Sequence, residues 1–260
     1  MKVAGTSVLV TGAGSGMGRQ LTLELVKRGA KVIAVDMRLE TLEETKKLAG
    51  KNVETFQIDI TDLGAVSELP SKVGTIDVLI NNAGIIQPFV KINDLEMSDA
   101  QKVMNVNFYG PFALIKAFLP ELLKRPKAHI LNVSSMGAYT PVPGQSVYGA
   151  SKAAVKLLTE GLRSELMETN VGVTVAFPGA VNTNITVNSG LQVPAGSENS
   201  EQAMKALPAT EAAKIMVDAI ESDKPRVTVG KDATMLDRLS RLNPVFAANL
   251  VYKKMKSLLQ

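Results

Sequence analysis

A run of glycines between two short apolar segments constrains the fold of this chain most strongly. Gly12-Ala-Gly-Ser-Gly-Met-Gly18 follows the β-branched segment Ser7–Thr11 and precedes a helical pattern that ends near Arg28. A second apolar segment, Lys31–Asp36, comes next and ends in an acid. Glycines let the backbone turn tightly and approach a pyrophosphate, which rests against the N-terminus of the following helix. Strand, glycine loop, helix and strand in this order predict a dinucleotide-binding unit.

The alternation of strand and helix continues through most of the chain. Ser98 is the predicted N-cap of the longest helix. We expect further strands at 53–59, 76–81, 128–134, 171–177 and 226–229, and helices at 39–49, 63–72, 98–123, 148–170 and 210–222. Strands that alternate with helices form one parallel sheet with helices on both faces. The sequence therefore predicts an α/β fold, a single doubly wound Rossmann-type domain with a parallel, seven-stranded sheet.

Two segments interrupt this alternation. Residues 184–208 are polar and rich in Ser, Asn and Gly, and a loop of this length inside a compact domain is often a lid over a site. Residues 233–260 have helical periodicity, and Lys253, Lys254 and Lys256 cluster near the end of this segment. We therefore expect a catalytic domain over 1–232 with a substrate lid at 184–208, and a C-terminal helical extension of the same domain over 233–260. The extension packs on the domain or on a second subunit, or it contacts a membrane surface as a basic amphipathic helix.

The composition is that of an ordinary globular protein, and it excludes several kinds of site. The net charge is +4 and no dense basic run lies beside aromatic residues, so nucleic acid is not an expected partner. The chain has no cysteine and a single histidine, His129, so no metal site is expected, and His129 is assigned no chemical role. No apolar run is long enough to cross a bilayer, and the N-terminus resembles a strand more than a signal peptide. These features predict a cytoplasmic protein.

Three polar side chains suit proton exchange with an alcohol or carbonyl oxygen. Tyr148 and Lys152 are four residues apart and project from the same face of a helix. Ser135 lies at the end of the preceding strand and can fold back towards that face. A phenol has an ordinary pKa of about 10, and a neighbouring ammonium lowers it. The sequence therefore predicts that Lys152 lowers the pKa of Tyr148 and prepares the phenol for acid/base catalysis.

With the glycine loop and the Tyr-x-x-x-Lys pair, the chain resembles the short-chain dehydrogenase/reductase family over about residues 5–230. The family's TGxxxGxG loop is matched by Thr11-Gly12, Gly16 and Gly18. The acidic segment after the third strand, the NNAG motif, the active-site asparagine, the catalytic serine and the PGxxxT motif follow in the family's order, at 59–62, 81–84, Asn107, Ser135 and 178–183. The resemblance implies a Rossmann-type fold and an NAD(P)-dependent oxidoreductase.

The resemblance also implies roles for individual residues. Tyr148 would be the acid/base, Ser135 would steady the reacting oxygen, and Lys152 would hold the nicotinamide ribose. Asn107 would support a water-linked proton path to Lys152. Taken alone, Asn107 equally fits a residue that satisfies backbone groups at a helix irregularity, and Ser135 equally fits a plain strand end. The expected cofactor contacts are Gly12, Ser15, Gly16, Met17, Gly18, Asp36, Asp59, Ile60, Asn82, Ala83, Gly84, Tyr148, Lys152, Pro178, Gly179, Val181 and Thr183.

Asp36 decides the predicted cofactor. A carboxylate at the end of the second strand accepts hydrogen bonds from the adenosine ribose hydroxyls and repels a 2′-phosphate. Arg19 and Arg38 lie nearby and would offset part of this repulsion. Ser15, however, stands where relatives that prefer the phosphate often carry a basic residue. The sequence therefore predicts NAD(H) rather than NADP(H).

The sequence constrains the substrate least. By the resemblance, the expected substrate contacts are Met136, Tyr139, Val142, Gln145, Ala180, Val187 and Leu191, which are mostly apolar. We therefore expect an uncharged, fairly hydrophobic alcohol or carbonyl compound, such as a steroid-, retinoid- or lipid-like molecule. The alternatives are an NADPH-dependent 3-oxoacyl-carrier-protein ketoreductase and, outside the enzymes, a catalytically silent dinucleotide sensor. The family commonly forms dimers or tetramers, so a homo-oligomer is expected.

Overall fold

The centre of the molecule is one parallel sheet of seven strands. A computed structural model of the chain describes residues 1–191 and 206–256. The strand order is β3-β2-β1-β4-β5-β6-β9, and every neighbouring pair is parallel. The strands are β1 (Ser7–Thr11), β2 (Lys31–Asp36), β3 (Val53–Gln57), β4 (Val78–Asn81), β5 (Ala128–Val133), β6 (Val171–Pro178) and β9 (Arg226–Val229). The order reverses between β1 and β4, which is where open α/β sheets bind ligands.

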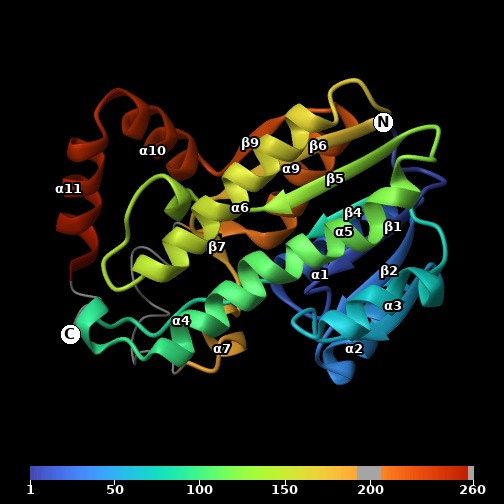
Figure 1. Cartoon of the computed structure of the whole chain (residues 1–260), viewed down its shortest axis with the longest axis horizontal. Helices are drawn as coiled ribbons and strands as arrows, with labels where there is room; N and C mark the ends of the chain where they lie inside the picture. The colour runs from blue at the N-terminus through green and yellow to red at the C-terminus, as the bar shows by residue number, and fades with distance from the viewer. Residues whose placement is uncertain (192–205, 257–260) are drawn as a thin grey trace.

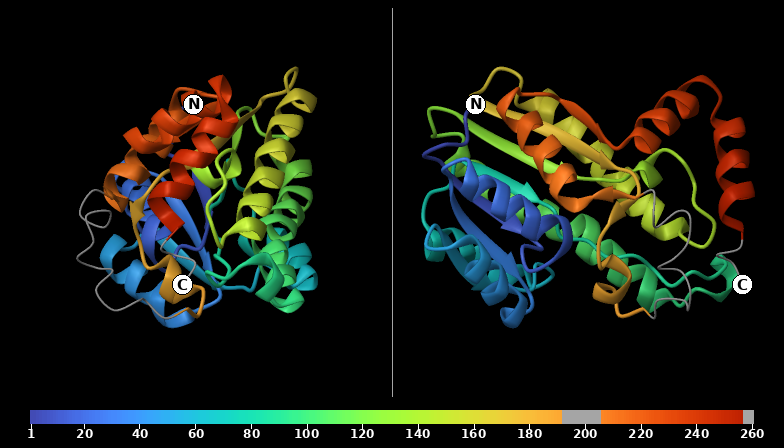
Figure 2. Two further views of the ribbon diagram at one scale, coloured as in Figure 1. Left: turned by 90° about the vertical axis from the view of Figure 1, so that its left-hand side faces the viewer. Right: turned by 180° about the vertical axis from the view of Figure 1, so that it is seen from behind.

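Helices cover both faces of the sheet, as the three views show (Figures 1 and 2). Successive side chains of a strand point to opposite faces, so Val8 and Val10 of β1 enter one buried core and Leu9 enters the other. The first core is closed by α1 (Gly16–Lys27), α2 (Leu39–Ala49) and α9 (Ala209–Glu221). The second core is closed by α3 (Leu63–Val73), α5 (Gly110–Leu122) and α6 (Ser146–Glu165). The predicted doubly wound, seven-stranded fold is confirmed.

The helix predicted over 98–123 is not one regular α-helix. It consists of α4 (Met97–Met104), a π-helical turn η2 (Asn105–Tyr109) and α5. The prediction of Ser98 as N-cap is wrong, because α4 begins at Met97 and the preceding residue is Glu96. The helix predicted to reach residue 170 ends at Glu165. A π-turn inside an α-helix is often found at a functional site, and η2 contains Asn107.

The segment predicted as a lid is partly structured where it is described. It contains α7 (Ile185–Asn188) and β8 (Leu207–Pro208), and β8 pairs in parallel with β7 (Val181–Asn182). Residues 192–205 of the predicted lid lie outside the described residues. Two short 3-10 helices, η1 (Ile92–Asp94) and η3 (Met136–Ala138), complete the loops on this side of the sheet.

The C-terminal extension forms two helices, α10 (Lys231–Leu242) and α11 (Pro244–Met255), and α10 begins two residues before the predicted boundary. Residues 257–260 lie outside the described part. α10 packs beside β9 and η3, whereas α11 packs on α10 and lies at the edge of the molecule farthest from the sheet (Figures 1 and 2).

The single histidine, His129, is buried in β5 at the opposite end of the sheet. Its Nε2 lies 2.8 Å from Thr174 Oγ1, and burial lowers the pKa of His129 to about 4.

Candidate active site

A cavity of about 600 Å³ opens at the carboxyl ends of β1, β2 and β4. Its volume is typical of a pocket for a cofactor or a small molecule. The glycine loop forms one wall, and α4 and α7 form others. Eleven of the predicted cofactor contacts line it: Gly12, Ser15, Gly16, Met17, Asp36, Asp59, Ile60, Asn82, Ala83, Gly84 and Thr183.

The glycine loop needs glycine for two different reasons. Gly12 has a φ of +67°, which lies in the left-handed region that side chains disfavour. Gly18 is buried in the first turn of α1, where a Cβ would overlap the carbonyl oxygen of Gly12. The loop therefore folds tightly onto the start of α1. The N–H groups of a first helical turn attract anions, so this loop and helix fit a pyrophosphate.

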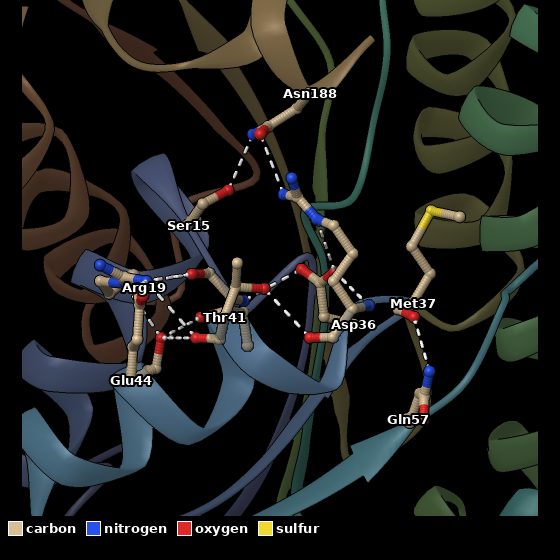
Figure 3. Close-up of polar contacts among 12 residues, drawn as sticks. Ser15, Arg19, Asp36, Met37, Thr41, Glu44, Gln57 and Asn188 are labelled. Atoms are coloured by element: carbon tan, nitrogen blue, oxygen red, sulfur yellow. Dashed lines mark hydrogen bonds and ion pairs between the residues drawn. The ribbon is translucent and has the colours of Figure 1, made fainter. Parts of the chain in front are cut away.

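Asp36 is held at the end of β2 by backbone donors. Its Oδ2 accepts a hydrogen bond from the Gly14 N–H at 3.0 Å, and its Oδ1 accepts one from the Arg38 N–H at 3.1 Å (Figure 3). The carboxylate is buried but lies in the cavity wall. This position fits the predicted contact with an adenosine ribose.

The two arginines near Asp36 are engaged with other groups. Arg19 Nη2 donates to the Gly14 carbonyl at 2.6 Å and to Glu44 Oε2 at 2.6 Å (Figure 3). Arg38 Nη2 donates to Asn188 Oδ1 at 2.9 Å, and its Nε lies 3.9 Å from Asp36 Oδ1. Arg19 therefore braces the glycine loop against α2, while Arg38 contacts both the carboxylate and α7.

The NNAG segment is tied to β1 and to the central strand. Thr11 Oγ1 accepts hydrogen bonds from the Asn82 and Ala83 N–H groups, both at 3.1 Å. Asn81 Nδ2 donates to Asn132 Oδ1 at 2.8 Å, across β4 and β5. These buried bonds fix the floor of the cavity where the strand order reverses.

Asn107 links the π-turn to the segment that follows NNAG. Its Oδ1 accepts from the Ile85 N–H at 2.9 Å, and its Nδ2 donates to the Ile85 carbonyl at 2.9 Å and to Ser151 Oγ at 3.0 Å. The amide therefore satisfies backbone groups beside a helix irregularity. It also lies close to Lys152, because a Cβ on Gly84 would be 3.2 Å from Asn107 Oδ1 and 3.1 Å from Lys152 Nζ.

Ser135, Tyr148 and Lys152 converge beyond the end of β5. The Ser135 hydroxyl accepts from the Gly137 N–H at 3.1 Å. It lies beside the Tyr148 ring, because a Cβ on Gly137 would be 3.5 Å from Ser135 Oγ and 3.6 Å from Tyr148 Cε1. The Lys152 side chain is buried, and its ammonium donates to the Val133 carbonyl at 3.0 Å. A hydroxyl, a phenol and an ammonium are thus gathered close together beyond the end of β5.

Burial shifts the pKa values of both ionisable groups. It raises the pKa of Tyr148 above its ordinary value, and the hydrogen bond with Ser135 opposes that rise. Burial lowers the pKa of Lys152 to about 8. The prediction that Lys152 lowers the pKa of Tyr148 is therefore wrong for this structure. The ammonium is bound to the Val133 carbonyl and lies 6.0 Å from the phenol ring centroid, so desolvation dominates.

Known proteins resemble this chain in sequence and in fold. The model of the short chain dehydrogenase family matches residues 6–194. The chain belongs to the short-chain dehydrogenase/reductase family. It is 36% identical to mouse "Dehydrogenase/reductase SDR family member 7B" over 237 residues, which are 85% of this chain and 72% of that protein.

Solved structures of the same family agree with the observed fold. A short chain dehydrogenase from Burkholderia cenocepacia in complex with NADP is 28% identical, with a TM-score of 0.82 over 96% of this chain and 99% of that one. A 3-ketoacyl-(acyl-carrier-protein) reductase from Brucella melitensis complexed with NADH is 26% identical. Its TM-score is 0.78 over 89% of this chain and 98% of that one. Family members thus bind a nicotinamide dinucleotide, and the cavity of this dehydrogenase/reductase fits such a group.

The remaining predicted cofactor contacts do not line the cavity. Gly18 packs behind the glycine loop, and the Gly179 N–H donates to the Val229 carbonyl at 2.9 Å. Pro178 ends β6 and Val181 begins β7. Tyr148 and Lys152 also lie outside the lining residues.

None of the predicted substrate contacts lines the cavity. Gln145 is buried and its Nε2 donates to the Gln87 carbonyl at 2.7 Å, while the Tyr139 hydroxyl donates to the Ala233 carbonyl at 2.8 Å. The Ala180 N–H donates to Asp232 Oδ2 at 2.7 Å. In this structure Gln145 joins the loop before α6 to the segment around Gln87, and Tyr139 and Ala180 join their loops to the start of α10. Met136, Val142, Val187 and Leu191 are at least partly exposed.

The sequence reasoning missed two residues that shape this dehydrogenase/reductase site. Gln87 Oε1 accepts hydrogen bonds from the Val147 and Tyr148 N–H groups, at 2.8 and 3.0 Å, and so fixes the first turn of α6. Asn188 Nδ2 donates to Ser15 Oγ at 2.8 Å while its Oδ1 binds Arg38, which joins the two walls of the cavity (Figure 3). No sequence pattern marks either residue, because both contacts join distant segments.

Proposed function

We propose that this chain interconverts a secondary alcohol and a ketone, or an alcohol and an aldehyde, with NAD(H) and with Tyr148 as the acid/base. The observation that carries the proposal is that Ser135, Tyr148 and the buried Lys152 lie close together beside a cavity that fits a dinucleotide. A phenol within hydrogen-bond reach of a reacting oxygen can exchange a proton with it.

Each polar group has a task in this mechanism. The nicotinamide dinucleotide supplies or accepts the hydride when it is bound. Tyr148 gives its proton to the carbonyl oxygen in reduction and takes the hydroxyl proton in oxidation. Ser135 donates a hydrogen bond to the same oxygen and stabilises its developing charge. Lys152 would bind the nicotinamide ribose, and Asn107 holds the backbone around Ile85 and would support a proton path to Lys152.

Three contacts support a preference for NAD(H). The Asp36 carboxylate is fixed in the cavity wall, where it accepts from ribose hydroxyls and repels a 2′-phosphate. Arg19 is bound to Gly14 and Glu44. Arg38 is drawn to Asn188, so its charge is shared between two partners. Arg19 is therefore engaged away from the carboxylate, and Arg38 offsets only part of its charge.

The substrate in this proposal is uncharged and fairly hydrophobic. The partly exposed residues after Ser135 and before Tyr148 include Met136 and Val142, and Val187 of α7 is exposed on the same side of the sheet. Apolar side chains at a site mouth favour an apolar substrate. This assignment would be wrong if only charged sugars or acids turned over.

A 3-oxoacyl-carrier-protein ketoreductase is the second candidate. It is favoured by the likeness to the Brucella melitensis reductase, although the chain shares 26% of its residues with that protein. A ketoreductase that uses NADPH has to accommodate a 2′-phosphate, which Asp36 opposes. Reduction of an acyl-carrier-protein thioester with NADPH, in preference to free alcohols with NAD, would move this candidate to first place.

The proposal includes a homo-oligomer in the cytoplasm. Large apolar side chains on the outer surface of the helices around the site, Tyr109, Phe112 and Leu157, are suited to a subunit contact. Light scattering would give the number of subunits, and cell fractionation would test the location.

The test is whether the natural protein oxidises alcohols with NAD. Purified protein is given NAD and a panel of secondary alcohols, and formation of NADH is followed by absorbance. We expect oxidation of hydrophobic alcohols by the natural protein. A protein that binds NAD(H) tightly but turns over none of the panel, in either direction, would instead be a dinucleotide sensor.

A further inference from the structure

The C-terminal helix α11 presents one face that nothing in the described structure covers. Ala247 and Val251 are buried against α10, so they mark the inner face of the helix. In both front and back views, α11 is set on the far side of α10 from the sheet (Figures 1 and 2). Its opposite face therefore points away from the domain.

Helical geometry defines the composition of this outer face. With 3.6 residues per turn, residues 245, 249, 252 and 256 lie along one line, and 246 and 253 flank it. Val245 is 68% exposed, Phe246 55% and Tyr252 53%. Asn249, Lys253 and Lys256 are also exposed. The outer face of α11 thus combines an aliphatic residue, two aromatic residues and two lysines, and Leu242, 84% exposed, extends it at the bend before the helix.

The charge around this face has one sign. Between residues 238 and 256 the chain contains Arg238, Arg241, Lys253, Lys254 and Lys256 and no acidic residue. Long lysine side chains can lay their methylenes on an apolar layer while the ammonium stays at a charged surface. Exposed aromatic and aliphatic side chains beside cations are the features of a helix that lies in a membrane interface.

We infer that the outer face of α11, with Leu242, docks on the surface of a membrane that contains anionic lipids. Phe246 and Tyr252 enter the boundary between headgroups and acyl chains, and Lys253 and Lys256 pair with lipid phosphates. Among the described residues, no helix has the length and apolar content to cross a bilayer, so the contact is peripheral.

A second copy of the chain fits this face less well. In a two-fold contact the same patch meets itself, so Lys253 and Lys256 would approach lysines of the other copy. The segment from 238 to 256 has no carboxylate to pair with them. Like charges at an interface oppose association, whereas an anionic lipid surface neutralises them.

Docking would bring the active-site loops near the lipid. The base of α10 holds two of them, because Asp232 accepts from the Ala180 N–H at 2.7 Å and the Ala233 carbonyl accepts from the Tyr139 hydroxyl at 2.8 Å. Arg226 also pairs with Asp237 of α10 and lies 4.2 Å from the Phe177 ring centroid. A membrane-bound α11 is therefore connected through α10 to the loops around Ser135 and Gly179.

The test is sedimentation of the full chain with vesicles. We expect binding to vesicles of phosphatidylcholine mixed with phosphatidylglycerol, weaker binding at high salt, and little binding to phosphatidylcholine alone. The double variant Lys253→Glu/Lys256→Glu should partition at least about 30-fold less, since the loss of each lysine removes about a fivefold factor and the new carboxylates are repelled by the anionic surface. Val245→Ser/Phe246→Ser should lose binding without a change in net charge.

A matched control separates docking from general charge. Lys46→Glu/Lys47→Glu makes the same charge change on exposed positions of α2, and we expect this variant to bind like the natural protein. Equal loss in the control, or no loss in the α11 variants, would overturn the inference. So would a natural protein that forms a larger oligomer than the α11 variants in size-exclusion chromatography, because the face would then be a subunit contact. Vesicle binding needs no turnover, so this test does not depend on the proposed reaction.

Discussion

The adenosine end of the cavity and the catalytic end, which is formed by Ser135, Tyr148 and Lys152 beside the cavity, are built differently. At the adenosine end, polar side chains are paired with each other and with backbone groups: Asp36 with Gly14, Arg19 with Glu44, and Arg38 with Asn188. At the catalytic end, Tyr148 and Lys152 are desolvated and their pKa values are shifted in opposite directions. The first end is arranged for recognition, because hydrogen bonds already hold its polar side chains in place. The second holds a proton donor in its neutral form, because burial disfavours the phenolate.

The difference means that the two ends should respond to different experiments. Changes at the catalytic end should alter turnover and its pH dependence and leave dinucleotide affinity largely intact. Changes at the adenosine end should alter the choice between NAD(H) and NADP(H). The substitutions below are ordered by the size of the effect that we expect.

Tyr148→Phe removes the phenol but keeps the ring. We expect kcat to fall by about 10²- to 10⁴-fold, since a positioned general acid or base contributes a factor of that size. The thermal shift produced by NAD(H) should stay close to that of the natural protein, because a ligand that binds only the folded state raises its stability according to its affinity. A variant with most of its activity intact would place the acid/base elsewhere.

The pH dependence of oxidation should follow the phenol. The pKa of Tyr148 is raised, so only a small fraction is phenolate near neutrality, and that fraction increases about tenfold for each pH unit below the pKa. Oxidation should therefore accelerate as the pH rises, whereas reduction, which needs the protonated phenol, should not. Lys152 loses its charge as the pH passes about 8, which should reduce the slope there. Rates in both directions between about pH 6 and pH 10, a range below the raised pKa of Tyr148, check the signs.

Asp36→Ala tests recognition at the adenosine end. Hydrogen bonds to a charged group contribute about 1.5–3 kcal/mol, so the preference for NAD(H) should narrow by about 10- to 100-fold in kcat/KM. Part of the loss in NAD(H) affinity will come from the Gly14 N–H, which loses its acceptor. An unchanged ratio between the two cofactors would contradict the role given to this carboxylate.

Asn188→Ala should have the smallest effect of the four. Without the amide, Arg38 loses a hydrogen bond and can turn towards a 2′-phosphate, so we expect the Kd of NADP(H) to fall by about two- to tenfold. Asn184→Ala is the matched control, because Asn184 is exposed and its side chain does not cap α7. Calorimetric Kd values for both cofactors decide the outcome. Identical behaviour of the two variants would mean that Arg38 is not restrained by Asn188.

The sequence predicted what local spacing can specify. The glycine loop, Asp36 and the Tyr148/Lys152 pair sit in patterns whose geometry follows from a few neighbouring residues, and the structure brings them to the same edge of the sheet. The seven strands were found because each is an apolar run between helical patterns. Strand order and cavity position then follow from the general rules of doubly wound sheets.

The rest could not be predicted because it depends on contacts between distant segments. Gln87 reaches α6 across 60 residues, and Asn188 reaches Ser15 across 173. The pKa of Tyr148 depends on desolvation, which no spacing in the sequence reports. Tyr139 and Ala180 were assigned to a substrate wall, but their partners lie on α10 and at its start, beyond the region that the family model covers.

The π-turn at η2 makes the number of residues between α4 and α5 critical. A π-turn contains one residue more than the corresponding α-helical turn, and one residue rotates everything beyond it by about 100°. α4 faces the cavity with Gln101 and Lys102, while α5 faces the core with Leu114 and Phe118, and the extra residue sets the angle between these two faces. Deleting one residue from 105–109 would turn the cavity wall out of alignment with the core. Among relatives, this stretch should therefore keep its length, without insertions or deletions.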